Sequence, residues 1–357
     1  MKIAKEIYYI VINTFLIALV FLIISHIFIK VYYNIAIPFS YTNLNTNQLQ
    51  SYSHMSKEDI KDLLNYTWGI GWEYEPWIGF KEKKRSSKFV NVNENGIRLN
   101  NINNKVILED SIWFFGGSTS FGYGVADFET IPAYLEKLSG QKVVNFGRGY
   151  YYSAQENLLL TQYLKMGITP KKVIFFDGVN ETCDLTTYQA NFKLLFEKSQ
   201  KNYFWDYFEI VKPVIYGYER IKSKIIIKNN KKIDNYNEIC KKNGFKLNFS
   251  DMIDYNLKER KMICEMYKLD CITFLEPFPY IHVLHKDDNY SENNQKTKNL
   301  KEKFKIVKTA FKNNQTISLT NVLQDYPKHA FVDSSHYNSE ANEIIAATIV
   351  KKIELTK

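Results

Sequence analysis

The chain has 357 residues, of which 45% are hydrophobic, so it can bury the core of one large domain and carry appendages. Its net charge is +9, with basic clusters at 81–85, 224–232 and 241–246. These clusters would attract an anionic membrane surface or an acidic polysaccharide, but a solvated lysine-rich surface explains them more simply. No nucleic-acid-binding motif accompanies the charge, and we therefore exclude a nucleic-acid partner.

The first predicted element is an apolar segment from Ile7 to Ile29 that contains no charged residue. As a helix rising about 1.5 Å per residue, it is long enough to cross the bilayer core. A cleaved signal peptide is the alternative, but its apolar core is typically about 7–15 residues long and a small-x-small cleavage site follows it. No convincing site of that kind is present, so we expect residues 1–33 to form a cytoplasmic tip and a single uncleaved transmembrane anchor.

The cations around this segment predict its orientation. Lys2 and Lys5 precede it, and after Lys30 there is no Lys or Arg until Lys57. The positive-inside rule therefore places the N-terminus in the cytoplasm and the rest of the chain outside it. The predicted protein is a single-pass membrane protein with an extracytoplasmic domain.

Residues 34–110 are predicted to form a connector and a strand-rich lead-in. The connector contains one helix, Ser56–Asn65, for which the Ser56 side chain is a suitable cap. Strand-like stretches follow within Tyr74–Arg98, where Asn95-Gly96 supplies a turn signal. We expect the lead-in to pack on the domain that begins at about residue 111.

From residue 111 onward, short apolar runs alternate with segments of helical periodicity. The runs are hydrophobic throughout, as expected of parallel strands that are buried on both faces. This alternation predicts a doubly wound, flavodoxin-like α/β/α fold with a mostly parallel sheet, whose functional groups gather at the carboxyl ends of the strands. The predicted strands are 112–115, 142–146, 173–177 and 271–275, and the predicted helices are 130–138, 153–166 and 339–353.

Two further features interrupt this pattern. Residues 183–250 are too long for an ordinary loop, and we expect a mostly helical insertion near the rim of the functional site, as a lid or a substrate-selecting cap. The four cysteines are not spaced for zinc, and we expect mostly buried thiols, with a Cys264–Cys271 disulfide as the alternative. These four are Cys183, Cys240, Cys264 and Cys271.

Two motifs at opposite ends of the α/β domain predict its chemistry. Gly116-Gly117-Ser118-Thr119 follows the first strand directly, so a tight turn would hold the Ser118 hydroxyl where a substrate can reach it. Near the C-terminus, Asp333 lies three residues before His336. A His with a carboxylate beside it is the natural base and base-orienter for such a serine. The pair predicts a serine hydrolase or an acyl-transferring enzyme with Ser118, His336 and Asp333 as its catalytic residues.

Between these motifs lie Asn145-Phe-Gly147-Arg-Gly149 and Gly178-Val-Asn180, each at the end of a predicted strand. In this order, the serine, glycine, asparagine and Asp-x-x-His blocks resemble the SGNH (GDSL-like) hydrolase superfamily, and its membrane-anchored members, over roughly residues 110–350. The resemblance implies ester hydrolysis or acyl transfer to a hydroxyl without a metal or organic cofactor. It also implies an oxyanion hole made by the backbone N–H groups of Ser118 and Gly149 and the side-chain amide of Asn180.

The chain departs from the superfamily pattern at two positions. Gly117 occupies the place of the usual acidic residue before the serine. Aligning Asn145 with the superfamily's asparagine puts Tyr150 where the oxyanion glycine usually falls. We take Gly149 as the donor, with Gly147 as the second choice.

An anchor that holds the enzyme outside the membrane favours substrates of the cell envelope. Acetyl groups on polysaccharide or peptidoglycan and lipid esters are the candidates, and O-acetylated glycan is the leading one. The alternative is a catalytically silent SGNH-like module that binds or scaffolds envelope polysaccharide machinery. The presence of Ser118, Asn180 and His336 argues against it. Hydrolysis and acyl transfer share the same acyl-enzyme, so both stay open.

Overall fold

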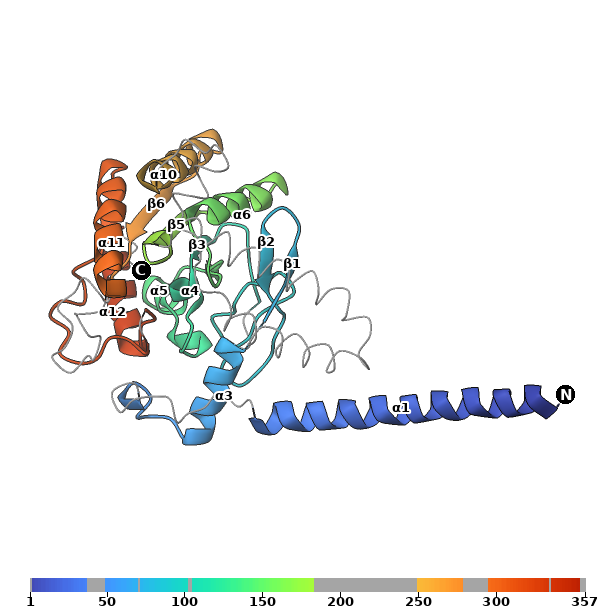
Figure 1. The fold of residues 1–357 in the computed structure, drawn as a ribbon. Helices are drawn as coiled ribbons and strands as arrows, with labels where there is room; N and C mark the ends of the chain where they lie inside the picture. The colour runs from blue at the N-terminus through green and yellow to red at the C-terminus, as the bar shows by residue number, and fades with distance from the viewer. Residues whose placement is uncertain are drawn as a thin grey trace.

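The computed structural model describes residues 2–36, 49–69, 71–101, 105–182, 249–278, 295–333 and 335–353. Nearly all of the insertion predicted at about 183–250 lies outside these residues. Figure 1 shows the described elements as a central sheet with helices around it and a long N-terminal helix.

The central sheet has five strands in the order β4-β3-β5-β6-β7, and every neighbouring pair is parallel. Renumbered within the domain, this order is 2-1-3-4-5, which is the flavodoxin-like order predicted from the sequence. The four predicted strands are confirmed, whereas the two-residue edge strand β7 was not predicted. The strands are β3 (Ile112–Gly116), β4 (Val143–Asn145), β5 (Lys172–Asp177), β6 (Cys271–Leu275) and β7 (Ile317–Ser318).

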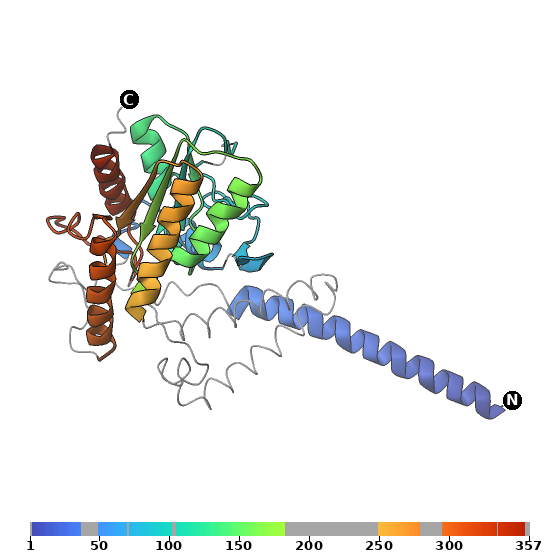
Figure 2. The same ribbon diagram turned by 90° about the horizontal axis from the view of Figure 1, so that it is seen from above.

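Helices cover both faces of this sheet (Figures 1 and 2). Alternate residues of β3 point to opposite faces, so Phe114 joins the core beneath α5 and α12 while Phe115 joins the core beneath α6 and α10. The α11 helix packs beside α10. These helices are α5 (Ile131–Ser139), α6 (Ser153–Lys165), α10 (Phe249–Met266), α11 (Gln295–Asn313) and α12 (Ser339–Lys352). The helices predicted at 130–138, 153–166 and 339–353 are thus confirmed.

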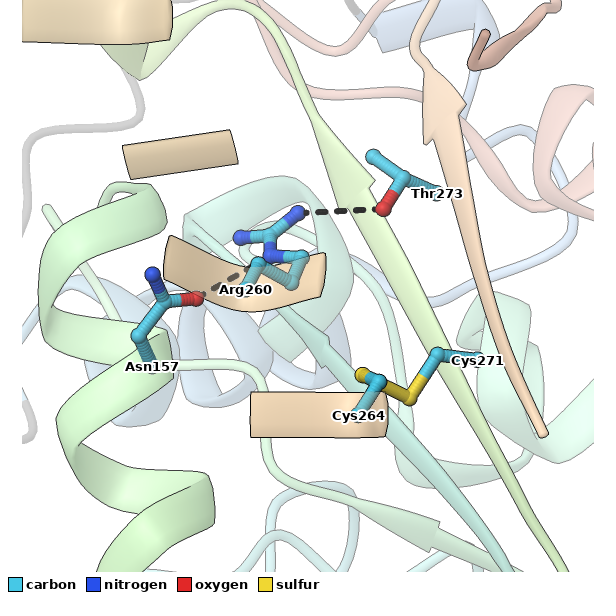
Figure 3. Close-up of a disulfide and its surroundings, with 5 residues drawn as sticks. All are labelled: Asn157, Arg260, Cys264, Cys271 and Thr273. Carbon is cyan, nitrogen blue, oxygen red and sulfur yellow. Dashed lines mark hydrogen bonds between the residues drawn. A yellow bond between two sulfur atoms is a disulfide. The ribbon is translucent and has the colours of Figure 1, made fainter. Parts of the chain in front are cut away.

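A disulfide joins α10 to β6 through Cys264 and Cys271 (Figure 3). The expectation of mostly buried thiols is therefore wrong for this pair, and the alternative holds. The bridge forms because α10 leads directly into β6, which brings the two Cα atoms to within 6.2 Å. Cys183 and Cys240 lie outside the described residues.

The lead-in packs on the α/β domain. Its helix, α3 (Lys57–Trp68), begins as predicted after Ser56, whose Oγ accepts a hydrogen bond from the Asp59 N–H at 3.1 Å. The strands β1 (Trp72–Glu75) and β2 (Gly79–Glu82) then form an antiparallel hairpin. Phe80 of this hairpin is buried in the same core as Trp113 of β3.

The N-terminal helix α1 (Lys2–Ala36) is 35 residues long. Its segment Lys5–Phe28 is long and apolar enough to cross a membrane, and none of its most hydrophobic stretch is buried within the protein. The helix therefore has the length and the apolar composition that the sequence predicted for a membrane-spanning segment.

Candidate active site

The serine turn depends on two glycines between β3 and the short helix α4 (Ser118–Phe121). A Cβ on Gly116 would lie 2.0 Å from Ser120 Oγ and 2.6 Å from the Phe176 carbonyl oxygen, so a larger residue does not fit. A Cβ on Gly117 would lie 2.2 Å from Nδ2 of Asn180. The acidic residue common at this position in the SGNH superfamily is therefore incompatible with the place that the Asn180 amide takes here.

Ser118, His336 and Asp333 form a continuous hydrogen-bonded relay. His336 Nε2 lies 2.7 Å from Ser118 Oγ, and His336 Nδ1 lies 2.8 Å from Asp333 Oδ2 and 2.9 Å from Oδ1. An Nδ1–H directed at Asp333 leaves Nε2 as an acceptor facing the serine hydroxyl. The structure thus brings together the three side chains that the two sequence motifs singled out.

The Asp333 carboxylate is set by local hydrogen bonds. The backbone N–H groups of Ser335 and His336 each donate to Oδ1 at 2.8 Å. Burial alone would raise the pKa of Asp333, but the charge and hydrogen bonds of His336 and these backbone donors outweigh it and lower the pKa below 3.8. Asp333 is therefore ionised at neutral pH and able to orient the imidazole.

A small antiparallel pairing holds the histidine loop. Phe331 and Tyr337 form an isolated bridge, and the Val332 N–H donates to the His336 carbonyl at 2.8 Å. The α12 helix begins right after it, where Asn338 Oδ1 caps the Ala341 N–H at 2.8 Å. The loop is thereby fixed at both ends.

Two aromatic rings flank the imidazole, and sequence reasoning did not identify either. The Trp68 ring meets His336 edge-on at 4.9 Å between centroids, and the Tyr123 ring stacks on it at 5.6 Å. Trp68 ends α3, so the lead-in contributes directly to the surroundings of the histidine. The rings leave the His336 residue only 6% exposed, which limits its orientations.

The glycine turn after β4 differs from its prediction. The Gly149 N–H donates to Glu82 Oε1 at 2.6 Å, and the Gly147 N–H donates to Asn145 Oδ1 at 2.9 Å. Both N–H groups are therefore engaged inside the protein. The prediction that Gly149 serves the oxyanion hole, with Gly147 as second choice, is at odds with these hydrogen bonds.

Tyr150, the next residue along this turn, has a left-handed backbone conformation. Its φ is 64°, in the left-handed region where glycine is usual, and it is the third residue of a turn closed by the Tyr151 N–H and the Arg148 carbonyl at 3.3 Å. Within the described part of the chain, no group accepts a hydrogen bond from the Tyr150 N–H. Sequence reasoning noted Tyr150 at this place but preferred the adjacent glycine for its residue type.

Asn180 lies beside the serine turn, at the start of the short helix η3 (Asn180–Thr182) that follows β5. Its Nδ2 donates to the Tyr151 carbonyl at 2.5 Å and fills the space left by the missing side chain of Gly117. The amide is thus fixed against the residue that precedes Ser118.

A buried ion cluster supports the ends of β5 and α6. Arg260 of α10 pairs with Glu156 Oε2 at 3.0 Å and Asp177 Oδ2 at 2.5 Å, and it also contacts Asn157 and Thr273 (Figure 3). Its guanidinium lies 3.7 Å from the centre of the Phe175 ring. Burial raises the pKa of Glu156 well above its ordinary value. Among the described contacts, Glu156 and Asp177 pair with Arg260 and not with Ser118. No sequence pattern indicated that these two acids would be buried.

No group of three or more His, Cys, Asp or Glu side chains suited to a metal ion occurs within the described residues. Ser118, His336 and Asp333 lie in the order in which a nucleophile, a base and a base-orienter could act together.

No protein-family profile matches the sequence, and no curated protein matches it. Several solved structures are similar. A member of the lipolytic protein G-D-S-L family from Veillonella parvula is 10% identical, with 68% of this chain and 96% of that chain covered and a TM-score of 0.35. The acetyl xylan esterase AlAXEase is 13% identical, with 68% and 99% covered and a TM-score of 0.37. Est24, a carbohydrate acetylesterase from Sinorhizobium meliloti, is 11% identical, with 69% and 99% covered and a TM-score of 0.38.

Proposed function

We propose that the protein is a serine esterase or acyl-transferring enzyme that works through an acyl-enzyme on Ser118. The observation that carries this proposal is the 2.7 Å contact between Ser118 Oγ and His336 Nε2, with Asp333 on the opposite ring nitrogen. A serine hydroxyl is a poor nucleophile until a base accepts its proton, and this relay supplies the base.

The reaction would proceed in two halves. In the first, Ser118 Oγ attacks the ester carbonyl while its proton passes to His336 Nε2. The tetrahedral intermediate then collapses, and the leaving alcohol takes that proton. In the second half, His336 accepts a proton from water or from an acceptor hydroxyl, which attacks the acyl group and restores Ser118. Asp333 would stabilise the imidazolium in both halves without accepting the proton itself.

Three donors would stabilise the oxyanion: the Ser118 N–H, the Tyr150 N–H and the Asn180 amide. The Ser118 N–H lies in the first turn of α4, where backbone N–H groups have no partner within a helix. Each well-placed donor contributes on the order of 3 kcal/mol to transition-state stabilisation. Tyr150 replaces Gly149 in this proposal because the Gly149 N–H is held by Glu82.

The substrate would be an acyl ester of a cell-envelope glycan or lipid, and O-acetyl groups are the leading candidates. Support comes from the apolar helix α1, which would hold the enzyme at a membrane surface. The Cys264–Cys271 disulfide supports an extracytoplasmic domain, because such bonds persist in oxidising compartments.

Labelling with a fluorophosphonate probe tests the function directly, because this probe reacts only with an activated serine. The full-length protein in detergent should be labelled, and Ser118→Ala should abolish labelling. Ser120→Ala is the matched control, since Ser120 is fully buried two positions away and should leave labelling intact. An unlabelled wild-type protein would instead favour the silent binding module. Labelled protein would then be assayed on acetylated sugars, short acyl esters and lipid esters.

A further inference from the structure

The carboxyl group of Glu276 is hydrogen-bonded to three separate segments of the molecule. Thr119 Oγ1 lies 2.8 Å from Oε2, and the Val179 N–H donates to Oε1 at 2.6 Å. The Tyr337 hydroxyl lies 3.2 Å from Oε2. Glu276 itself follows β6 directly and is only 2% exposed, so these contacts are shielded from water.

Each of the three partners is the chain neighbour of a residue in the proposed active site. The pairs are Ser118–Thr119, Val179–Asn180 and His336–Tyr337. The nucleophile, the oxyanion amide and the base therefore each lie one residue away from a group that contacts the same carboxyl.

The backbone near Glu276 is shaped for this close approach. A Cβ on Gly178 would lie 2.9 Å from Leu275 Cδ1 and 3.2 Å from Glu276 Cγ, and the φ of Gly178 is 146°. Glycine at this position lets the end of β5 come close enough for the Val179 N–H to reach Glu276. Gly178 of the Gly-Val-Asn block is thus needed for the close approach of Glu276 as well as for the turn.

The Tyr337 hydroxyl lies between two acceptor oxygens, one of which belongs to Glu276. The Tyr337 hydroxyl has one hydrogen, and the Pro277 carbonyl accepts it at 2.5 Å. The same hydroxyl also donates to Glu276 Oε2 at the longer distance of 3.2 Å, so its hydrogen is shared between the two oxygens. Burial, together with the charge of Asp177, raises the pKa of Glu276 from 4.5 to about 8.

We propose that Glu276 is a positioning residue that holds the serine, asparagine and histidine segments in register for catalysis. This role rests on the proposed function. When Glu276 ionises, it places a second negative charge near Asp177, which is itself paired with Arg260. The three segments would then shift relative to one another, and misplacement by about 1 Å can cost a hundredfold in rate.

Comparing Glu276→Gln with Glu276→Ala tests the proposal in the full-length protein. Glutamine has nearly the same volume, carries no charge and keeps an acceptor for the Val179 N–H, so kcat on a short acyl ester should stay within about threefold of wild type. Alanine should lower kcat about a hundredfold with little change in KM, because the substrate contacts remain while the reacting groups lose their register.

The pH profile provides a readout that a purely structural role would not move. Wild-type kcat/KM should fall as the pH rises through about 8, and Glu276→Gln should lack this basic limb. Thr119→Val and Tyr337→Phe each remove one partner at nearly constant volume, and each should lower the rate several-fold. These two variants decide the question if Glu276→Ala does not fold.

Two results would overturn the inference. One is a folded Glu276→Ala protein that has the wild-type rate and pH profile. If Glu276→Ala does not fold, the same result for folded Thr119→Val and Tyr337→Phe proteins takes its place. The other is a folded Glu276→Gln that is as impaired as Glu276→Ala. Fluorophosphonate labelling of Ser118 distinguishes failure of the inference about Glu276 from failure of the proposed function. Labelled wild type with an equally fast Glu276→Ala protein rejects the role of Glu276 alone, whereas unlabelled wild type rejects both.

Discussion

The Gly149 N–H donates to Glu82 Oε1 at 2.6 Å, which ties the glycine turn of the active site to the lead-in hairpin 67 positions earlier in the chain. The neighbouring Arg148 is also held by the lead-in. Its guanidinium is fully buried, pairs with Glu75 and donates to the Asn95 carbonyl at 3.0 Å. The lead-in therefore contacts the glycine turn of the candidate active site directly.

Removing the Glu82 carboxyl should damage this turn. Glu82→Ala leaves the Gly149 N–H buried without an acceptor, at a cost of about 1–3 kcal/mol in the free energy of unfolding. Glu82→Gln retains the acceptor and is the control, with near wild-type ester turnover. Thermal unfolding and kcat of both variants provide the check. An alanine variant that matches the glutamine variant in both would show that the hydrogen bond is dispensable.

Glu82 should also make stability depend on pH. Burial, opposed in part by Arg148, raises its pKa from 4.5 to about 7, so the folded protein holds this proton more tightly than the unfolded chain. The stabilising contribution is complete below pH about 4.5 and is lost as the pH rises through 7. Between pH about 4.5 and about 7, the melting temperatures of wild type and Glu82→Gln should therefore diverge, because wild type loses more stability. Parallel curves would contradict the raised pKa.

The sequence predicted those features that depend on contiguous residues. The serine turn and the Asp333–His336 pair are local motifs, and the buried strands are unbroken apolar runs. Glu82 and Glu276 were missed because a single acid at a strand end looks like a solvent-exposed residue, and only tertiary packing buries it. The edge strand β7 has two residues and no pattern to recognise.

The turn at Gly149 and Tyr150 shows a different limit of sequence reasoning. The sequence prediction took Gly149 as the donor, and glycine is the residue usually found where φ is positive. In the structure, the positive φ falls on Tyr150 and the glycine is needed for another reason. A Cβ on Gly149 would lie 2.7 Å from the Tyr123 hydroxyl. Close packing rather than backbone conformation therefore explains this glycine.

A crystal structure of the fluorophosphonate adduct should test the oxyanion assignment. We expect the phosphonyl oxygen within about 2.7–3.1 Å of the Ser118 and Tyr150 N–H nitrogens and of the Asn180 amide. The Gly149 N–H should remain on Glu82. Tyr150→Gly keeps the backbone donor and should retain activity within about threefold. A phosphonyl oxygen bound by the Gly149 N–H would restore the original prediction and reject Tyr150.

Asp333→Asn should separate the catalytic role of this carboxylate from its structural role. The asparagine Oδ1 can still accept from the backbone N–H groups of Ser335 and His336, so the loop should keep its fold. Its amide hydrogens would face His336 Nδ1 and stabilise the wrong tautomer, and kcat should fall by a factor of about 10²–10⁴. Unchanged thermal unfolding with that loss is the expected result. Activity near the wild-type level would remove Asp333 from the catalytic relay.

Gly117→Ala should act through Asn180. The added Cβ would lie 2.2 Å from Asn180 Nδ2, so the amide must move away from the oxyanion position. We expect kcat to fall about 10²–10³-fold, the usual loss for one oxyanion donor. The double variant Gly117→Ala/Asn180→Ala should then be no slower than either single variant, because both remove the same donor. Additive losses would mean that Gly117 affects the serine by another route.

The orientation of the chain in the membrane can be tested with spheroplasts. Lys2 and Lys5 precede the apolar helix, so the positive-inside rule predicts a cytoplasmic N-terminus and an external α/β domain. A protease added to intact spheroplasts should then degrade the domain, and a high-salt wash should leave the undigested protein in the membrane fraction. Cys264 and Cys271 should resist thiol-specific labelling until a reductant is added, as expected for a disulfide formed outside the cytoplasm. A domain that is protected until lysis and carries two free thiols at these positions would reverse the orientation and place Ser118 inside the cell.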